Sequence, residues 1–173
     1  VLDVFGKRAL VQRCQVHKRR NVLEHLPEEK RPGVETILKE AFRAATSKTA
    51  KGRLEALAGR LAADYPSAAE SLREGLDELF TVKELGVPED LERALSTTNA
   101  IENVNNGIRR ITRRVKHWRG GTMILRWLGA ALQELQDGFH RIKGYRGMKD
   151  LVAALHARDA SLAPAIGNQE KAA

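Results

Sequence analysis

The sequence predicts a mainly α-helical protein with one residual β-strand, and three observations support this. Apolar residues recur at steps of three and four through most of the chain, the spacing that gives a helix one buried face. Aromatic residues make up only 5% of the sequence, and alternating runs of β-branched residues, typical of half-buried strands, are absent. A hydrophobic content of 42% with 30% charged residues fits a globular chain, and 173 residues suffice for one moderate core.

The one convincing strand is ALVQRC at residues 9–14, which is short and apolar enough to lie in the middle of a sheet. The sequence offers no partner strand for it. An isolated strand of this kind is what a piece of an α/β core would retain. After it we expect a short helix from His17 to about His25, ending before Pro27.

Residues 27–95 are predicted to form an all-helical block. The polar segment 47–52 is expected to interrupt the helices, and Pro88 is expected to open the last short one. Residues 61–95 hold nine acids against three bases, so this block is acidic although the whole chain has a formal charge of +8. The main helical stripes fall at 34–45, 54–65 and 66–80.

Residues 96–119 combine an apolar stripe with a polar face that begins in one acid and continues in cations. The predicted stripe consists of Ile101, Val104, Ile108, Ile111 and Val115. The acid is Glu102, and at 100° per residue Arg109 and Arg113 fall on the same face as its carboxylate. The cations of the segment are Arg109, Arg110, Arg113, Arg114, Lys116 and Arg119. One carboxylate is therefore expected at the head of a row of cations.

Two interpretations of Glu102 compete. With Asn99 as the N-cap, Glu102 follows three residues later in a capping-box arrangement, and an acid in the first turn suits the helix dipole. Alternatively, the carboxylate holds a divalent cation while the arginines hold the DNA backbone. A single carboxylate cannot build a two-metal site, so the second interpretation requires partner acids from elsewhere.

The C-terminal third is predicted to be helical with a basic loop. Gly120 and Gly121 make a turn into a helix whose apolar face would form a hairpin with the Glu102 helix. Trp118 either packs in the core or at the boundary of this hairpin, which is the favoured interpretation, or stacks on an unpaired base. The loop at 140–149 carries Lys143 and Arg146 as candidate phosphate contacts. The last residues are small and polar and are expected to form a disordered tail.

The charge distribution favours a nucleic-acid partner, because the positive balance is confined to particular segments; a merely basic surface is the alternative. The single cysteine excludes an intrachain disulfide and points to the reducing cytoplasm. No apolar run is long enough to span a bilayer, so no membrane partner is expected.

Cys14 and His17 form a Cys-x-x-His pair directly after the predicted strand. The pair supplies two of the four ligands of a structural zinc site, but no paired Cys or His elsewhere completes it. A buried thiol and an imidazole that shape an active site or contact DNA are the favoured interpretation. The neighbouring Lys18, Arg19 and Arg20 either begin a solvated helix or contact phosphates.

The segments TTNAIENVNNGIRRITRRVKHWR and QRCQVHKRRNVLEHLP together resemble Mutator-type transposases of bacterial insertion sequences. These are DDE enzymes with a ribonuclease H-like core, and their third catalytic acid is the Glu of a TTNxIExxN segment, here Glu102. Cys14 and His17 match the family's Cys-x-x-His pair, which has no assigned role. The resemblance covers about residues 4–155.

The resemblance implies DNA cleavage and strand transfer at transposon ends by two Mg²⁺ ions held by three acids, one of which is Glu102. It further implies a homo-oligomer associated with the nucleoid. The family's two catalytic aspartates lie upstream of the Cys-x-x-His pair, where this chain has only Asp3, too close to match. We therefore expect the C-terminal part of a longer protein, inactive alone. The alternatives are a non-catalytic DNA-binding helical protein and an inactive remnant.

The resemblance also implies a division of the chain into four parts. We expect the residual end of a ribonuclease H-like core at 1–26, an all-helical insertion at 27–95, the Glu-bearing basic helix with the C-terminal helices at 96–158, and a disordered tail at 159–173.

Overall fold

Helices account for all the regular secondary structure in the computed structural model, which describes residues 4, 6 and 9–166. The longer helices are α2 (Gln15–Glu24), α3 (Arg31–Phe42), α4 (Ser47–Leu61), α5 (Pro66–Arg73), α8 (Asn99–Thr112), α9 (Gly121–Gln136) and α10 (Met148–Ile166). The shorter elements are α6 (Thr81–Glu84), α7 (Glu89–Leu95) and the 3₁₀ turns η2 (Asp77–Leu79) and η3 (Tyr145–Gly147). The prediction of a mainly α protein is confirmed.

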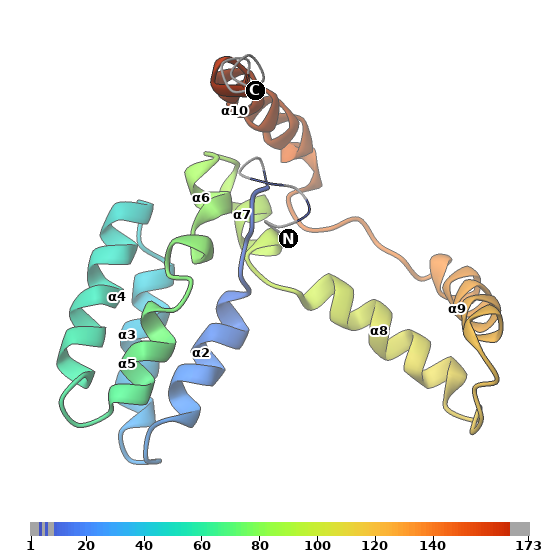
Figure 1. The fold of residues 1–173 in the computed structure, drawn as a ribbon, viewed down its shortest axis with the longest axis horizontal. Helices are drawn as coiled ribbons and strands as arrows, with labels where there is room; N and C mark the ends of the chain where they lie inside the picture. The colour runs from blue at the N-terminus through green and yellow to red at the C-terminus, as the bar shows by residue number, and fades with distance from the viewer. Residues whose placement is uncertain (1–3, 5, 7–8, 167–173) are drawn as a thin grey trace, which may run out of the picture.

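The predicted strand at 9–14 is wrong, because this segment has no regular secondary structure and runs beside the bundle as a single thread (Figure 1). Its backbone groups bond instead to the segment around η2 and α6. The Arg13 N–H donates to the Glu78 carbonyl at 2.8 Å, and the Thr81 hydroxyl donates to the Val11 carbonyl at 2.6 Å. An apolar run forms a strand only beside another strand, and the described part of the chain supplies none.

The main core lies among α2, α3, α4 and α5, which pack against one another as a bundle (Figure 1). Its largest fully buried side chains include Leu38, Leu54, Leu72 and Phe80, one from each of α3, α4 and α5 and one from the turn after η2. Val22 of α2 is also fully buried there. The predicted division after residue 26 therefore falls inside this core.

Helix α4 begins earlier than the sequence predicted. Thr46 is its N-cap, and the Thr46 hydroxyl accepts a hydrogen bond from the Thr49 N–H at 3.1 Å. The polar segment 47–52, predicted to break the helices, is therefore the first part of α4. The interruption falls at residues 43–46 instead. Pro66 at the start of α5 and Pro88 as the N-cap of α7 agree with the prediction.

Lys18 is buried, with 4% of the residue exposed, and fastens α2 to the C-terminal end of α5. Its ammonium donates to the Ser71 carbonyl at 2.5 Å and to the Glu74 carbonyl at 2.8 Å. Cations are stabilising at the C-terminus of a helix, where carbonyl groups lack intrahelical partners. The expectation of a solvated or phosphate-contacting cation at position 18 is wrong.

A second, smaller core forms where the basic loop after α9 meets α7. Val82, Val87 and Leu91 are buried there, with Ile142 from the loop packed against them. Gly144 has φ +76°, and a Cβ at this position would lie 2.3 Å from the Leu91 backbone nitrogen. Only glycine allows so close an approach, so the loop is held against the start of α7.

Helices α8 and α9 pack against each other and form an arm that extends away from the bundle (Figure 1). At their crossing a Cβ on Gly107 would lie 2.7 Å from the Leu135 side chain, so the glycine permits the close approach. The predicted hairpin is confirmed, but the expected burial of its stripes is not. No residue of α8 is buried, and of the α9 stripe only Ala131 is.

Helix α10 continues to Ile166, beyond residue 159 where the sequence predicted a disordered tail. Residues 167–173 and Asp3 lie outside the described residues. Within the described ranges, no helix combines the length and the apolar character needed to cross a membrane. A ribonuclease H-like core is not shown by the described residues, so that part of the fold stays a prediction.

Candidate functional site: the Glu102 carboxylate and the cations of α8

Glu102 lies in the first turn of α8, where Thr98 is the N-cap. The predicted capping box with Asn99 as the N-cap is wrong, because Asn99 is already the first helical residue. Thr98 makes no side-chain capping bond to the backbone. Its hydroxyl instead donates to Glu102 Oε1 at 2.5 Å. The carboxylate is thus fixed by a side chain one turn earlier in the chain.

The structure brings His17 to this carboxylate from the start of α2, although His17 and Thr98 are 81 positions apart in the sequence. His17 Nδ1 lies 3.4 Å from Thr98 Oγ1, and His17 Nε2 lies 3.6 Å from Glu102 Oε1. Thr98 and His17 therefore both approach the same carboxylate oxygen, Oε1 of Glu102. About half of each of these two side chains remains accessible to solvent, namely 51% of the His17 side chain and 45% of the Glu102 side chain.

Cys14, the other member of the Cys-x-x-His pair, is the N-cap of α2 and lies at the edge of the same cluster. Burial opposes ionisation of the thiol. Hydrogen bonds from the backbone of His17, Thr98 and Val16 oppose that burial, and the Cys14 pKa is lowered to about 7. An N-terminal helix position favours a thiolate in the same sense. We call Cys14, His17, Thr98 and Glu102 the Glu102 cluster.

The Glu102 cluster offers too few oxygen ligands for a magnesium site. Mg²⁺ prefers an octahedral shell of oxygen atoms, usually from one or two carboxylates with water and substrate phosphates. Glu102 is the only carboxylate in the cluster, and its Oε1 already accepts from Thr98. Across the described residues, no three His, Cys, Asp or Glu side chains come together closely enough to hold a metal ion. Glu102 thus fits the role of one ligand among several.

The cations that follow Glu102 are exposed along α8 and beyond its end. Helix α8 stops at Thr112 with Arg113 as its C-cap, so the predicted helical row is shorter than expected. Arg109 and Arg110 occupy the last turn, where cations complement the helix dipole. Within the described part of the chain, no acid forms an ion pair with Arg109, Arg110, Arg113, Arg114, Lys116 or Arg119.

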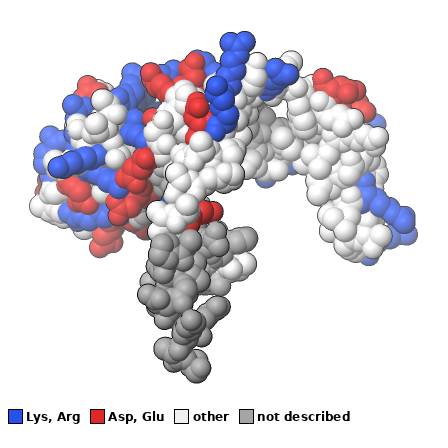
Figure 2. All heavy atoms as spheres, turned by 90° about the horizontal axis from the view of Figure 1, so that it is seen from above, with Lys and Arg blue, Asp and Glu red and all other residues white. Residues whose placement is uncertain are grey.

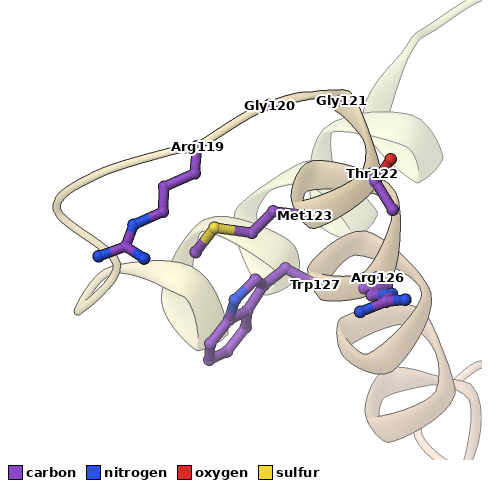
Figure 3. A pocket seen from close by; sticks show the side chains of 7 residues that line it. All are labelled: Arg119, Gly120, Gly121, Thr122, Met123, Arg126 and Trp127. Atoms are coloured by element: carbon purple, nitrogen blue, oxygen red, sulfur yellow. The ribbon is translucent and has the colours of Figure 1, made fainter.

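The turn from α8 into α9 forms a shallow pocket of about 510 Å³ (Figure 3). Arg119 enters it from the connecting loop, while Met123 and Trp127 lie side by side on the facing side of α9. Arg126 also lines the pocket, farther from Arg119 than Met123 and Trp127 are in this view (Figure 3). Trp118 is 44% exposed, so it is not a core residue, and its packing at the boundary of the hairpin stays a prediction.

Lys143 and Arg146 lie apart from α8, on the loop that docks against α7. The Lys143 ammonium is 3.2 Å from Asp90 Oδ1, so its charge is partly neutralised. The Arg146 guanidinium lies 5.9 Å from the centre of the Tyr145 ring, in a cation–π contact. Figure 2 shows cations and acids intermixed over the bundle, whereas the end of the molecule where α9 lies is mostly uncharged on this face.

Sequence reasoning missed Thr98, the residue that joins His17 to Glu102. A threonine four residues before a glutamate at the start of a helix was a usable signal, because side chains at i and i+4 are neighbours. The meeting of His17 with Glu102 had no signal in the residue pattern, since it depends on how α2 and α8 are placed.

Comparison with known proteins identifies one family. The sequence model described as "Transposase, Mutator family" matches residues 2–142. A transposase for insertion sequence element IST2 of Acidithiobacillus ferrooxidans is 33% identical over 106 residues, covering 61% of this chain and 35% of that protein. A probable insertion-sequence transposase of Corynebacterium diphtheriae is 31% identical over 130 residues, covering 75% of this chain and 37% of that protein. A transposase for IS256 in transposon Tn4001 of Staphylococcus aureus is 30% identical over 132 residues, or 73% of this chain and 32% of that protein. The chain spans about a third of the length of these relatives.

Proposed function

The chain belongs to the Mutator family of transposases, and on that basis we propose that it is the C-terminal part of a DDE transposase that cuts and joins DNA at the ends of an insertion sequence. The meeting of the two sequence motifs carries the proposal. The Cys-x-x-His segment and the Glu segment are far apart in the chain, yet His17 and Thr98 both contact one oxygen of Glu102. Motifs that converge on one carboxylate are expected at an active site.

In this proposal Glu102 supplies one carboxylate ligand to Mg²⁺, and the remaining acids come from a part of the transposase outside the present chain. Bound Mg²⁺ ions would activate the attacking hydroxyl and stabilise the leaving oxygen of the phosphodiester. The residues of the chain have a positioning task. Thr98 and His17 fix Oε1 of Glu102, which leaves Oε2 free to face a ligand.

DNA is the proposed partner of the cations on α8. Six exposed cations without ion pairs in the described structure follow the carboxylate along one helix and the turn after it. Unpaired surface cations bind phosphates by releasing counterions, so their binding depends strongly on salt. The row would hold the backbone of the DNA that passes Glu102. A homo-oligomer that brings two transposon ends together belongs to the same proposal.

A second candidate is a DNA-binding protein without catalytic activity. It is favoured by one observation, namely that no group of three His, Cys, Asp or Glu side chains among the described residues could hold a metal ion. Such a protein would bind DNA through the same cations, and its binding would not respond to Mg²⁺.

Substitution of Glu102→Gln in the protein encoded by the complete reading frame distinguishes the two candidates. Glutamine keeps the acceptor for Thr98 but removes the negative charge that a divalent cation needs. With a duplex that carries the ends flanking the reading frame, we expect Mg²⁺-dependent strand cleavage to disappear while DNA affinity changes little.

The matched control is Glu134→Gln, which removes an exposed carboxylate on α9 and should cleave like the wild type. Retained metal-dependent cleavage in the Glu102→Gln variant would refute the catalytic role of Glu102. DNA binding without any cleavage by the wild type would favour the second candidate.

A further inference from the structure

A groove of about 820 Å³ lies between α2, α3 and α7, beside the Glu102 cluster. Gln15 and Val16 line one wall of the groove, and the next residue along the chain is His17. Ser96 and Thr97 line the groove beside them, because the Gln15 N–H donates to the Ser96 carbonyl at 3.0 Å, and the next residue is Thr98. This end of the groove therefore adjoins the Glu102 cluster. We call this cavity the α3–α7 groove.

The α7 wall of the groove is electrically balanced. Lys83 pairs with Glu92 at 2.7 Å, and Arg93 pairs with Glu89. These ion pairs occupy the acids that line the groove, so the α7 wall presents little net charge to a ligand.

The α2 and α3 wall is positive. Arg19 and Lys39 share a single acid, Glu35, at 3.6 Å and 2.9 Å. Arg43 is exposed at the end of α3, and no ion pair to it is present in the described structure. This wall thus has three cations for one acid, which suits a phosphate backbone.

An aromatic ring lies among these cations. Phe42 packs on one side against Phe80 in the main core, with ring centres 6.2 Å apart, and its remaining surface lines the groove. A ring held in place by the core and open on its other side is a platform on which a base stacks without sequence preference.

We propose that the α3–α7 groove binds an unpaired stretch of the DNA strand next to the position held by Glu102. The inference rests on the proposed function and adds a path for one strand. A volume within the range of small-molecule pockets, about 300–1,000 Å³, admits a few nucleotides of one strand but not a duplex. Arg43 contacts a phosphate, and Phe42 stacks on a base.

Two single substitutions test the groove in the 173-residue chain. Arg43→Ala removes a cation that holds no other described side chain, so it should not affect folding. Phe42→Leu removes the aromatic surface and keeps an apolar side chain against Phe80. Arg60→Ala is the matched control, because Arg60 is an exposed arginine on α4 outside the groove. The double substitution Arg109→Ala with Arg113→Ala reports on the α8 cations.

Binding is measured by fluorescence anisotropy with a labelled oligothymidylate of about 12 nucleotides, a usual single-strand site size, and with a duplex of equal length, over a range of salt. For Arg43→Ala we expect the slope of log affinity against log salt to fall by about 0.7 for the single strand, the loss of one phosphate contact. For Phe42→Leu we expect single-strand affinity to fall at least about fivefold, with duplex affinity unchanged.

The outcomes separate this inference from the proposed function. A wild-type slope for Arg43→Ala together with weaker binding by the α8 double variant overturns the groove and leaves DNA as the partner. Equal losses for single strand and duplex in Phe42→Leu overturn the unpaired-strand assignment. No binding of either DNA by the wild type at low salt refutes the DNA partner itself. If Phe42→Leu is unfolded by circular dichroism, the Arg43→Ala slope decides alone.

Discussion

Replacing Lys18 with methionine should lower the free energy of unfolding by about 2–4 kcal/mol. The Lys18 ammonium donates at 2.5 Å and 2.8 Å to two carbonyls at the end of α5. Hydrogen bonds to charged groups contribute roughly 1.5–3 kcal/mol each. Methionine keeps the volume of the stem and avoids burying a charge, which offsets part of the loss.

Thermal unfolding followed by circular dichroism measures the effect. For a chain of this size we expect the midpoint to fall by roughly 5–15 °C. Lys39→Met is the matched control, because Lys39 is an exposed lysine paired with Glu35 within one helix, and such pairs contribute about 0–1 kcal/mol. Equal midpoints for Lys18→Met and Lys39→Met would refute the reasoning that Lys18 fastens α2 to α5.

Three other predictions concern the thiol, the docked loop and the cations of α8. The rate of Cys14 alkylation by iodoacetamide should rise with pH, with a midpoint near pH 7 in the folded chain, because the thiol pKa is lowered to about 7. In urea the midpoint should lie near pH 8.5, where a free thiol titrates. Equal midpoints in the two states would contradict the structure. Gly144→Ala should destabilise the chain by more than about 1 kcal/mol, because φ is +76° and the new Cβ would clash with the Leu91 backbone nitrogen. Gly129→Ala in the middle of α9, with nothing near the added Cβ, should instead stabilise the chain by about 0.5–1 kcal/mol. Chemical denaturation compares the two variants, and an unchanged free energy of unfolding for Gly144→Ala would show that the loop does not dock. The double substitution Arg109→Ala with Arg113→Ala should reduce the salt slope of duplex binding by about 1.8, the loss of two phosphate contacts; an unchanged slope in an anisotropy titration would place the DNA elsewhere.

Much of the helical architecture could be predicted from the sequence, because helix boundaries have local causes. Pro66 and Pro88 mark the starts of α5 and α7, and the stripes of α8 and α9 predict their pairing. The segment 9–14 could not be assigned reliably, since a short apolar run fits a strand or a docked loop equally well. Its true partners lie around η2 and α6, far along the chain.

The candidate site was predictable only in part. Glu102 and the cations after it are adjacent in sequence, so the residue pattern alone groups them. The approach of His17 and the burial of Lys18 depend on tertiary placement, which no periodicity encodes. The apolar stripe of α8 shows the same limit, because the pattern identifies the apolar face but does not say what covers it.

We propose above that this chain is the C-terminal part of a DDE transposase in which Glu102 is the third catalytic acid, and this proposal is the central one. Translation of the DNA upstream of the codon for Val1, in the same reading frame, tests it most directly. We predict an uninterrupted frame with two aspartates, each on or just after a strand-like segment. A stop codon or a frameshift before such aspartates would contradict the claim.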